Sequence, residues 1–358
     1  MIICVYAIAK DEARHVERFC VAAREADSIA VLDTGSTDGT PELLRERGCI
    51  VETEVIEPWR FDVARNRSLE LIPEGTDAAV CLDLDEVLLP GWREELEKRW
   101  TPETQIGRYT CICGRNADGT PRTTFVRDKI HRPGAVRWIY PVHEVTEYIG
   151  AGDPVRADVT AMACEHLPDD GKSRAGYLPL LELAARERPQ DARSAHYLGR
   201  EYMYRGRWAD AIAELTRHLG LPSATWAEER AASMRYLSAC CDAMGDRRGA
   251  LSWALRSIAE APMLRECWYA AAKACYHAAD WPGVVYYGER AAAVTERSRS
   301  AINEREAWGE AVDDLLSLGY WYTGDREKAL AHGERALALA PEDTRIRRNV
   351  EYYKGVQP

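Results

Sequence analysis

Short apolar runs alternate with amphipathic segments over the first ninety residues of the chain. Runs typical of buried strands occupy residues 2–8, 28–32, 49–55 and 78–82. Helical patterns separate them at about 11–25, 41–48 and 61–71, and the second of these begins with Pro41 and ends at Gly48, as helices often do. This alternation of strand and helix predicts an α/β domain with a mostly parallel, Rossmann-like sheet.

From about residue 173 the strand signal gives way to alanine-rich helical periodicity that repeats four times. In each repeat an apolar residue is followed thirteen positions later by a second one, at Leu198 and Ala211, Leu237 and Ala250, Ala271 and Val284, and Leu316 and Ala329. Turn residues lie between the members of each pair, at Gly206, Gly245, Asp280 and Gly324, and prolines follow three of the units, at Pro222, Pro262 and Pro341. Such repeats predict a solenoid similar to tetratricopeptide (TPR) repeats, whose LGxxY core is matched by Leu198, Gly199 and Tyr202. An unrelated helical bundle with alanine-rich faces is the alternative.

These two patterns, together with the length of 358 residues, predict two domains. We expect an α/β domain over residues 1–170, a connecting helix over 171–190 and an all-helical repeat domain over 191–358. The formal charge of −11 is unevenly divided, since residues 1–170 carry −12 and residues 171–358 carry +1. The two halves are therefore expected to have different roles.

The cysteines and the apolar runs indicate the compartment. Eleven cysteines are scattered through apolar segments without a CxxC pair, which argues against a zinc ribbon and against a secreted disulfide framework. The N-terminal run has no basic segment before it and no small-residue cleavage site after it, and no stretch approaches 18 apolar residues. We therefore expect a soluble, cytoplasmic protein with reduced thiols and no membrane span.

Acidic residues follow two of the predicted strands, at the edge where parallel sheets bind ligands. Asp33 ends the second run and precedes a turn that holds Gly35 and Gly39. A carboxylate and free backbone N–H groups there suit the base and the sugar hydroxyls of a nucleotide. Asp83 and Asp85 follow the fourth run, and carboxylates at positions i and i+2 of an extended segment can both approach a hard divalent cation. Taken alone, either segment could instead be a solvated turn.

Further short segments accompany these acids. They are 8–12 (IAKDE), 33–40 (DTGSTDGT), 61–67 (FDVARNR), 83–86 (DLDE) and 142–144 (VHE), with a later His166. In this order they resemble the family-2 glycosyltransferases of the GT-A fold, in the branch with a C-terminal TPR-like array. The resemblance implies a GT-A catalytic domain and a metal-dependent, inverting transfer of a sugar from a nucleotide-sugar, a UDP-sugar, to an acceptor hydroxyl.

The resemblance also implies a role for individual residues. Those that would bind the donor are Ile8, Glu12, Asp33, Arg65 and Asp83. The ligands of a Mn²⁺ or Mg²⁺ ion would be Asp83, Asp85 and His166. Glu144 would take the proton of the acceptor, with His143 as its rival and Asp128 and Asp169 as further candidates. At the domain junction, the charges of Lys172 and Arg174 could cap the phosphates of the donor.

A basic stretch interrupts the acidic half. Between Arg108 and Arg137 seven basic residues face two acids, a local charge of +5, and Trp138 and Tyr140 follow directly. The stretch is either a solvated face or an electrostatic track for an anionic acceptor or for the diphosphate. The acceptor classes that stay open are a glycan, a peptide and a hydroxymethylpyrimidine in phage-type modified DNA. The repeat domain would supply an acceptor surface or a homodimer interface.

A protein of another class fits the same organisation: a TPR scaffold whose glycosyltransferase-like domain is inactive and only binds partners. The retained acids argue against it, because a charged pocket without a ligand costs stability. A sugar nucleotidyltransferase fits less well, since residues 8–12 lack the glycine-rich phosphate loop that it needs.

Overall fold

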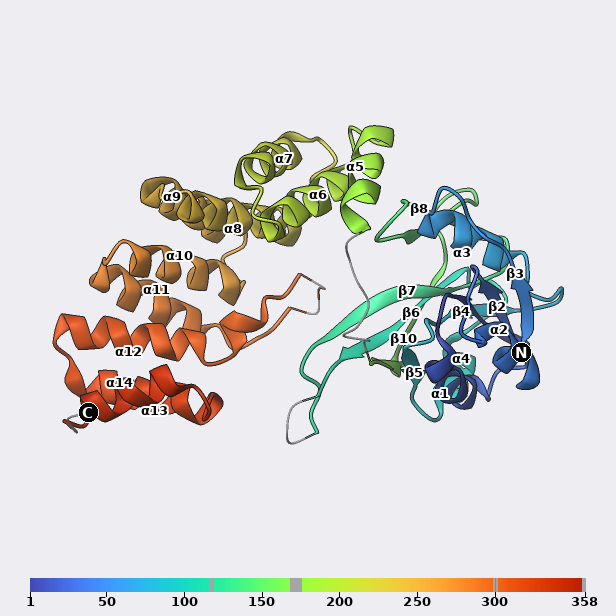
Figure 1. Ribbon diagram of the computed structural model, residues 1–358, viewed down its shortest axis with the longest axis horizontal. Coiled ribbons are helices and arrows are strands. Elements are labelled where there is room, and N and C mark those ends of the chain that lie inside the picture. Colours follow the sequence, from blue (N-terminus) through green and yellow to red (C-terminus); the bar gives the residue numbers. More distant parts are fainter. Residues whose placement is uncertain (116–118, 168–175, 299, 301, 356–358) are drawn as a thin grey trace. The chain divides into compact units, whose positions relative to one another are not determined.

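The computed structural model describes residues 1–115, 119–167, 176–298, 300 and 302–355 (Figure 1). Contacts divide the chain into two compact units, Met1–Ala184 and Ala185–Pro358. The division falls within helix α5 (Tyr177–Glu187). Residues 168–175 lie outside the described part of the chain, so the domain limits at 170 and 190 stay predictions.

The first unit is a mixed α/β structure built on one large sheet. The strands of this sheet are β1 (Ile3–Ala9), β2 (Ser28–Asp33), β3 (Ile50–Thr53), β4 (Ala78–Cys81), β5 (Glu86–Leu88), β6 (Ile106–Cys113), β7 (Thr124–His131) and β10 (Arg156–His166). They lie in the order β3-β2-β1-β4-β7-β6-β10-β5, while β8 (Val136–Ile139) and β9 (Val145–Tyr148) form a separate pair. The helices before α5 are α1 (Ala13–Ala23), α2 (Thr40–Glu46), α3 (Phe61–Leu69) and α4 (Trp92–Arg99).

The predicted alternation of strands and helices over residues 1–82 is confirmed, and β3, β2, β1 and β4 are all parallel. The rest of the sheet is more mixed than expected. Strand β7 runs antiparallel to both β4 and β6, and β5 runs antiparallel to β10. A hairpin such as β6–β7 returns the chain antiparallel without the long crossover that a parallel neighbour needs.

The reversal at β7 also decides where strand ends meet. Because β7 is antiparallel to both its neighbours, β6 runs in the same direction as β4 and β1, and β10 is parallel to β6. The carboxyl ends of β1, β2, β4 and β10 therefore lie at one edge of the sheet. Asp33, the acids after β4 and His166 all belong to that edge.

The centre of the sheet is buried on both faces, which explains the uninterrupted apolar runs. Ile3, Val5 and Ala7 of β1 pack into one core cluster with Phe19 of α1. Tyr6, on the opposite face of the same strand, packs with Trp138 of β8 in a second cluster. Side chains packed on both faces of the sheet thus fix the position of β1. The predicted donor-binding segment 8–12 begins at the end of this strand.

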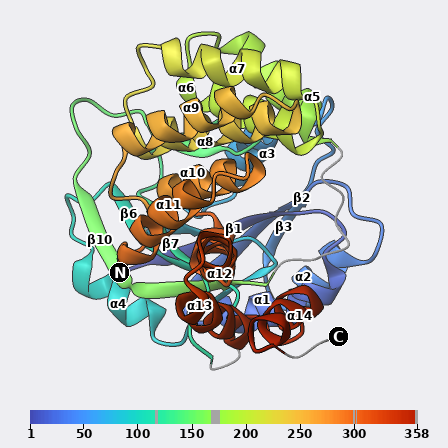
Figure 2. The same ribbon diagram turned by 90° about the vertical axis from the view of Figure 1, so that its left-hand side faces the viewer.

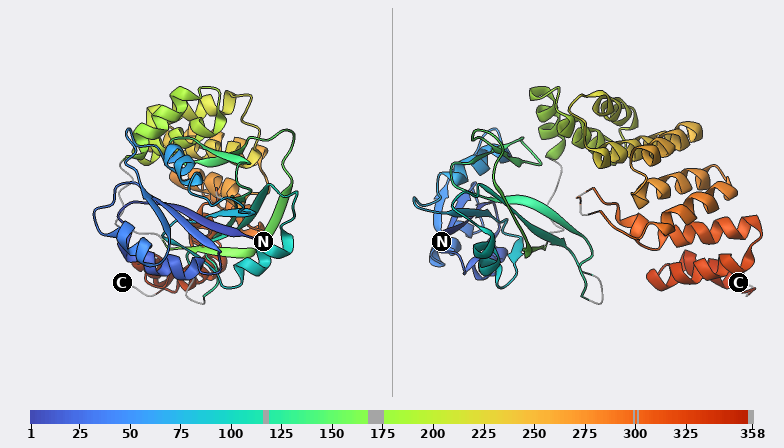
Figure 3. Two further views of the ribbon diagram at one scale, coloured as in Figure 1. Left: turned by 90° about the vertical axis from the view of Figure 1, so that its right-hand side faces the viewer. Right: turned by 180° about the vertical axis from the view of Figure 1, so that it is seen from behind.

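The second unit is all-helical in its described residues and consists of helical hairpins followed by one more helix (Figures 2 and 3). The hairpins are α6 (Ala192–Tyr204) with α7 (Trp208–Gly220), α8 (Ala227–Ala243) with α9 (Arg247–Glu260), α10 (Arg265–His277) with α11 (Trp281–Ala293), and α12 (Ala311–Thr323) with α13 (Arg326–Leu339). Helix α14 (Thr344–Tyr353) follows, and a 3-10 turn, η1 (Arg305–Trp308), precedes α12. All eight apolar residues of the predicted repeat pairs are buried, as a TPR-like solenoid requires.

Two local features explain the repeat pattern. A Cβ added at Gly199 of α6 would lie 2.6 Å from Cγ of Leu215 in α7, so the glycine permits close helix packing. In three hairpins a glycine takes the left-handed turn conformation, but the third hairpin uses Ala279, with φ of 55°. Asp280, the turn residue expected from the sequence, lies one position later and caps α11, accepting a 3.1 Å hydrogen bond from the Gly283 amide.

Among the described residues, no helix combines the length and the apolar character that crossing a bilayer requires.

Candidate functional site

The loops that leave β1 and β2 are tied to each other. The backbone amide of Thr37 donates a 2.8 Å hydrogen bond to Asp11, and the amide of Asp11 donates one of 2.8 Å to Oγ of Ser36. Asp38 accepts a 2.9 Å hydrogen bond from the Ala13 amide at the start of α1. Burial acts to raise the pKa of Asp38, but its hydrogen bonds with Thr40 and the Ala13 amide lower it below the ordinary value. The predicted turn is therefore ordered.

Asp33 lies under this turn and is fully buried. Its Oδ2 accepts hydrogen bonds of 3.2 Å from the amides of Gly35 and Ser36, while Oδ1 has no partner in the described part of the chain. A buried acceptor without a donor is unfavourable, and a donor supplied by a ligand would relieve it. Ile8 is next to this position in the sheet, since Ala9 pairs with Asp33, and Glu12 is buried in the adjoining loop. The structure thus brings together Ile8, Glu12 and Asp33.

Arg65 of α3 is the centre of a buried charge network. Its side chain is 4% exposed, and its Nη2 donates a short hydrogen bond to Oδ1 of Asp83. Its Nε donates a 3.1 Å hydrogen bond to Oε1 of Glu144. The guanidinium carbon lies 5.4 Å from the ring centroid of Trp138. Two carboxylates and an aromatic face therefore fix this guanidinium.

Asp83 is held by a second cation. Nζ of Lys129 donates a 2.9 Å hydrogen bond to its Oδ2, so both carboxylate oxygens are occupied. Burial alone would raise the pKa of Asp83, but the charges of Arg65 and Lys129 hold it well below the ordinary value. Burial would likewise lower the pKa of Lys129, and the Asp83 carboxylate raises it above the ordinary value. Asp83 thus neutralises two protein cations, and its role as a metal ligand stays a prediction.

Asp85 and His166 face each other at the carboxyl edge of the sheet. Oδ2 of Asp85 lies 3.3 Å from Nε2 of His166, and both side chains are partly exposed. The backbone also joins the two segments, through a 2.9 Å hydrogen bond from the Leu167 amide to the Asp85 carbonyl. The hydrogen bond with Asp85 raises the pKa of His166, although burial acts in the opposite direction. Adjacent ligands of an octahedral ion with bonds of about 2.1 Å lie about 3 Å apart, so this pair fits a Mn²⁺ or Mg²⁺ ion.

The candidate proton acceptors lie between β8 and β9. Glu144 uses Oε1 to accept the hydrogen bond from Arg65, and Oε2 accepts none among the described residues. His143 has φ of 53° and packs its ring edge-on against Tyr177 of α5, with the centroids 5.7 Å apart. Both residues are partly exposed. Lys172, Arg174 and Asp169 lie outside the described residues.

The basic stretch is largely neutralised by acids from other segments. Within the described residues its ion pairs are Arg108–Asp158, Arg115–Glu165, Arg127–Glu86, Lys129–Asp83 and Arg137–Glu147. Arg132 donates hydrogen bonds to three backbone carbonyls, including that of Thr104 at 3.0 Å. An anionic acceptor would therefore compete with the chain's own carboxylates, and the electrostatic track stays a prediction.

Sequence reasoning missed Lys129 and Trp138 as parts of the Arg65 network. In the sequence, Lys129 is one charge of the basic stretch, and Trp138 is an aromatic residue that follows it. Arg127, Lys129 and His131 occupy every second position of β7, which is a weak signal that they share one face of the sheet. The partner of Lys129 could not be found, because Asp83 lies 46 positions away.

The repeat unit has a cavity of about 980 Å³ on the faces of α6, α8 and α10, closed on one side by residues 302–310. Arg200, Tyr204 and Tyr236 are among the residues that line it. Glu304 and Glu306, in the segment before α12, accept hydrogen bonds from residues that line the cavity. Nε of Arg235 donates a 2.8 Å hydrogen bond to Glu304, and the Tyr269 hydroxyl donates one of 3.2 Å to Glu306.

Comparison with known proteins supports the repeat unit. No protein-family model matches the chain. A TPR repeat-containing protein of Synechococcus elongatus is 28% identical over 144 residues, which cover 39% of this chain and 34% of that protein. The match therefore spans about a third of the length of this curated relative.

Several solved structures resemble part of the chain at low identity. MamA is 17% identical with a TM-score of 0.38, over 48% of this chain and 90% of that one. PilF of Pseudomonas aeruginosa is 13% identical with a TM-score of 0.39, over 50% and 72%. YrrB, described as a TPR protein with an unusual peptide-binding site, is 13% identical with a TM-score of 0.37, over 48% and 80%. Such low values carry no argument about function, and it is the helical hairpins together with the curated relative that make the second unit a TPR-like repeat region.

Proposed function

We propose that the protein joins a partner-binding TPR-like repeat region to a metal-dependent glycosyltransferase domain of the GT-A type. The comparisons favour the binding role over the enzymatic one, since none of the relatives above is named for an enzymatic activity. The enzymatic role is supported by one observation. Asp85 and His166, 81 positions apart in the sequence, lie 3.3 Å apart at the carboxyl edge of the sheet to which Asp33 also belongs.

The residues of this edge suit sugar transfer from a nucleotide-sugar such as a UDP-sugar. A divalent cation held by Asp85 and His166 would supply Lewis-acid neutralisation of the departing diphosphate. Oδ1 of Asp33 is an unpartnered buried acceptor, which a donor group of the nucleotide would satisfy once the covering turn makes room for it. In an inverting transfer the acceptor oxygen bonds to the anomeric carbon as the bond to the diphosphate breaks, and Oε2 of Glu144 takes the acceptor proton.

The proposal is tested by calorimetry of the full chain with UDP, with and without Mn²⁺. Wild type is expected to bind UDP in a Mn²⁺-dependent way, and Asp85→Asn is expected to weaken that binding by at least about tenfold. Asp158→Asn, which changes an exposed acid paired with Arg108 on the same unit, is the control and should bind as wild type does. Absence of UDP binding to wild type would instead favour the inactive scaffold. A panel of nucleotide-sugars scored by hydrolysis would then identify the sugar.

A separate observation favours an acidic peptide segment as the partner of the repeat region. Glu304 and Glu306 of the chain itself are bound at the wall of the cavity, by Arg235 and by Tyr269, and Nζ of Lys273 lies 3.6 Å from Glu306. Burial would lower the pKa of Arg235, but Glu304 raises it above the ordinary value, so the guanidinium stays charged. The wall thus already holds two carboxylates of the chain itself, and an acidic peptide would compete with them.

This role is tested with a panel of acidic peptides and neutral peptides of the same length. Acidic peptides are expected to bind more tightly, and Arg200→Glu at the cavity should weaken them by at least about tenfold. Arg248→Glu, an exposed change that does not line the cavity, is the control. Equal binding to both variants would exclude the cavity as the peptide site.

A further inference from the structure

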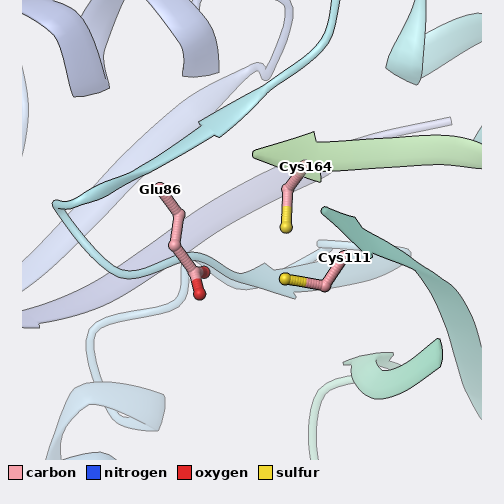
Figure 4. A group of neighbouring side chains, drawn as sticks. All are labelled: Glu86, Cys111 and Cys164. Atoms are coloured by element: carbon pink, nitrogen blue, oxygen red, sulfur yellow. The ribbon is translucent and has the colours of Figure 1, made fainter. Parts of the chain in front are cut away.

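Three side chains of the kinds that bind metal ions come together inside the first unit. They belong to three different strands that are far apart in the sequence. Glu86 of β5, Cys111 of β6 and Cys164 of β10 are all buried, and their carboxylate oxygen and sulfur atoms lie within 4.8 Å of one another. Figure 4 shows the three side chains pointing toward one another. No other residues in the described part of the chain form such a group.

The sheet register holds these residues in place. Cys164 is the direct partner of Cys111 in the parallel pair of β10 and β6. Glu86 of β5 is the antiparallel partner of His166 of β10. His166 lies two residues after Cys164, so both are on the same face of β10. Because paired residues project to one face of a sheet, the group does not depend on a mobile loop.

The spacing fits a tetrahedral thiolate site. With bonds of about 2.3 Å from zinc to sulfur, two sulfur ligands lie about 3.8 Å apart, so the observed group needs a contraction of about 1 Å or less. The sulfur of Cys113 lies 4.0 Å from that of Cys111, outside the group of three. The strands need not move for adjustments of this size.

Charge balance is compatible with a divalent cation here. Arg127 neutralises Glu86 through an ion pair, and its Nη2 donates a 2.7 Å hydrogen bond to Sγ of Cys111. A divalent ion that displaces the protons of two thiols leaves the net charge of this buried group unchanged. The ligands of a metal site usually accept hydrogen bonds from surrounding residues. Arg127 donates such hydrogen bonds both to the Glu86 carboxylate and to the Cys111 sulfur.

We propose that Glu86, Cys111 and Cys164 form a structural site for a thiophilic divalent cation of the Zn²⁺ type, separate from the Asp85–His166 pair. Zinc bound there joins β5, β6 and β10, next to the strand end that carries His166. The soft sulfur ligands distinguish this site from the sheet edge, where the carboxylate of Asp85 suits Mn²⁺ or Mg²⁺.

The test is to produce the full chain in medium with Co²⁺ in place of Zn²⁺ and to measure its metal content and near-ultraviolet absorption. We expect about one equivalent of Co²⁺ with a thiolate-to-cobalt charge-transfer band. Cys111→Ser and Cys164→Ser should each lower the band by at least about tenfold. Cys4→Ser, a buried cysteine of β1, and Asp85→Asn should both retain it.

The outcomes separate the two metal sites. Loss of the band in Asp85→Asn, or its persistence in both Cys111→Ser and Cys164→Ser, would overturn the thiolate site. So would a wild-type chain that carries neither Co²⁺ nor Zn²⁺ after purification, a measurement that does not depend on the folding of any variant. Failure of UDP binding with an intact thiolate band would overturn the glycosyltransferase proposal alone.

Discussion

Nε of Arg65 donates a 3.1 Å hydrogen bond to Oε1 of Glu144, across 79 positions of the sequence. The same guanidinium holds Asp83, so one buried cation sets the positions of two acids that the sequence pattern singles out. Removing one partner of such a buried network leaves an uncompensated charge, which costs about 3–5 kcal/mol. Glu144 is thus fixed in position whether its remaining oxygen acts in catalysis or only binds.

The change Glu144→Gln separates these roles. The amide oxygen still accepts the hydrogen bond from Arg65, but it cannot take a proton, so we expect sugar transfer to fall by about 10²–10⁴-fold while UDP binding is retained. Transfer and UDP binding are measured on the same preparations. Glu147→Gln, at an exposed ion pair on β9, is the matched control. Loss of both properties in Glu144→Gln would make Glu144 a structural or donor-binding residue.

His131 predicts how stability depends on pH. Burial lowers its pKa to about 4. Its Nε2 lies 2.7 Å from the Tyr6 hydroxyl, which accepts a hydrogen bond from Trp138 Nε1 at 3.0 Å and so donates its proton to the imidazole. The unfolded chain binds a proton near pH 6.5 and the folded chain only near pH 4. The stability that the neutral ring contributes is therefore present above about pH 6.5 and is lost as the pH falls toward 4, by up to about 3 kcal/mol.

Denaturant unfolding of the full chain between pH 7 and pH 4 measures this slope. The change His131→Gln keeps a polar side chain that does not titrate, so the loss of stability between these pH values should be smaller than in wild type by about 3 kcal/mol or less. An unchanged slope in the variant would show that other groups govern the acid response.

The third repeat turn predicts a stabilising change. Ala279 has φ of 55°, where the other three hairpins use glycine. The left-handed conformation costs an alanine about 1–2 kcal/mol, and the greater entropy of glycine in the unfolded chain offsets part of the gain. We expect Ala279→Gly to raise stability by about 0.5–1 kcal/mol, and Gly245→Ala, at the equivalent turn with φ of 82°, to lower it by a similar amount. Thermal melting of the two variants checks the pair, and shifts of the same sign would contradict the explanation.

Close helix packing predicts the effect of filling a glycine. Gly199→Ala would place a methyl group 2.6 Å from Cγ of Leu215, and overpacking of this kind costs about 1–3 kcal/mol. Gly220→Ala, also in the first hairpin, meets nothing within 4 Å and should be neutral or slightly stabilising. Unfolding in urea compares the two variants. If both behave alike, the glycine in the LGxxY motif has no packing role.

The sequence by itself determined the elements of this protein. The apolar runs at β1, β2 and β4 and the repeat pairs such as Leu198 and Ala211 are local patterns, set by burial of neighbouring positions on one strand or helix. The approach of Asp85 to His166 was also expected, on the basis of the resemblance. In the third hairpin the sequence predicts the turn at Asp280, one residue after Ala279, which has the left-handed conformation.

Only the tertiary structure decided which charges meet. That Asp83 pairs with Lys129, and that most of the basic stretch is paired with acids, depends on strand order and direction, which bring together residues tens of positions apart. The same holds for Cys111 and Cys164, which are unremarkable in the sequence and direct partners in the sheet. The physical reason is that hydrophobic periodicity reports burial along one element, whereas ion pairs and ligand groups depend on distances between elements, which strand pairing alone fixes.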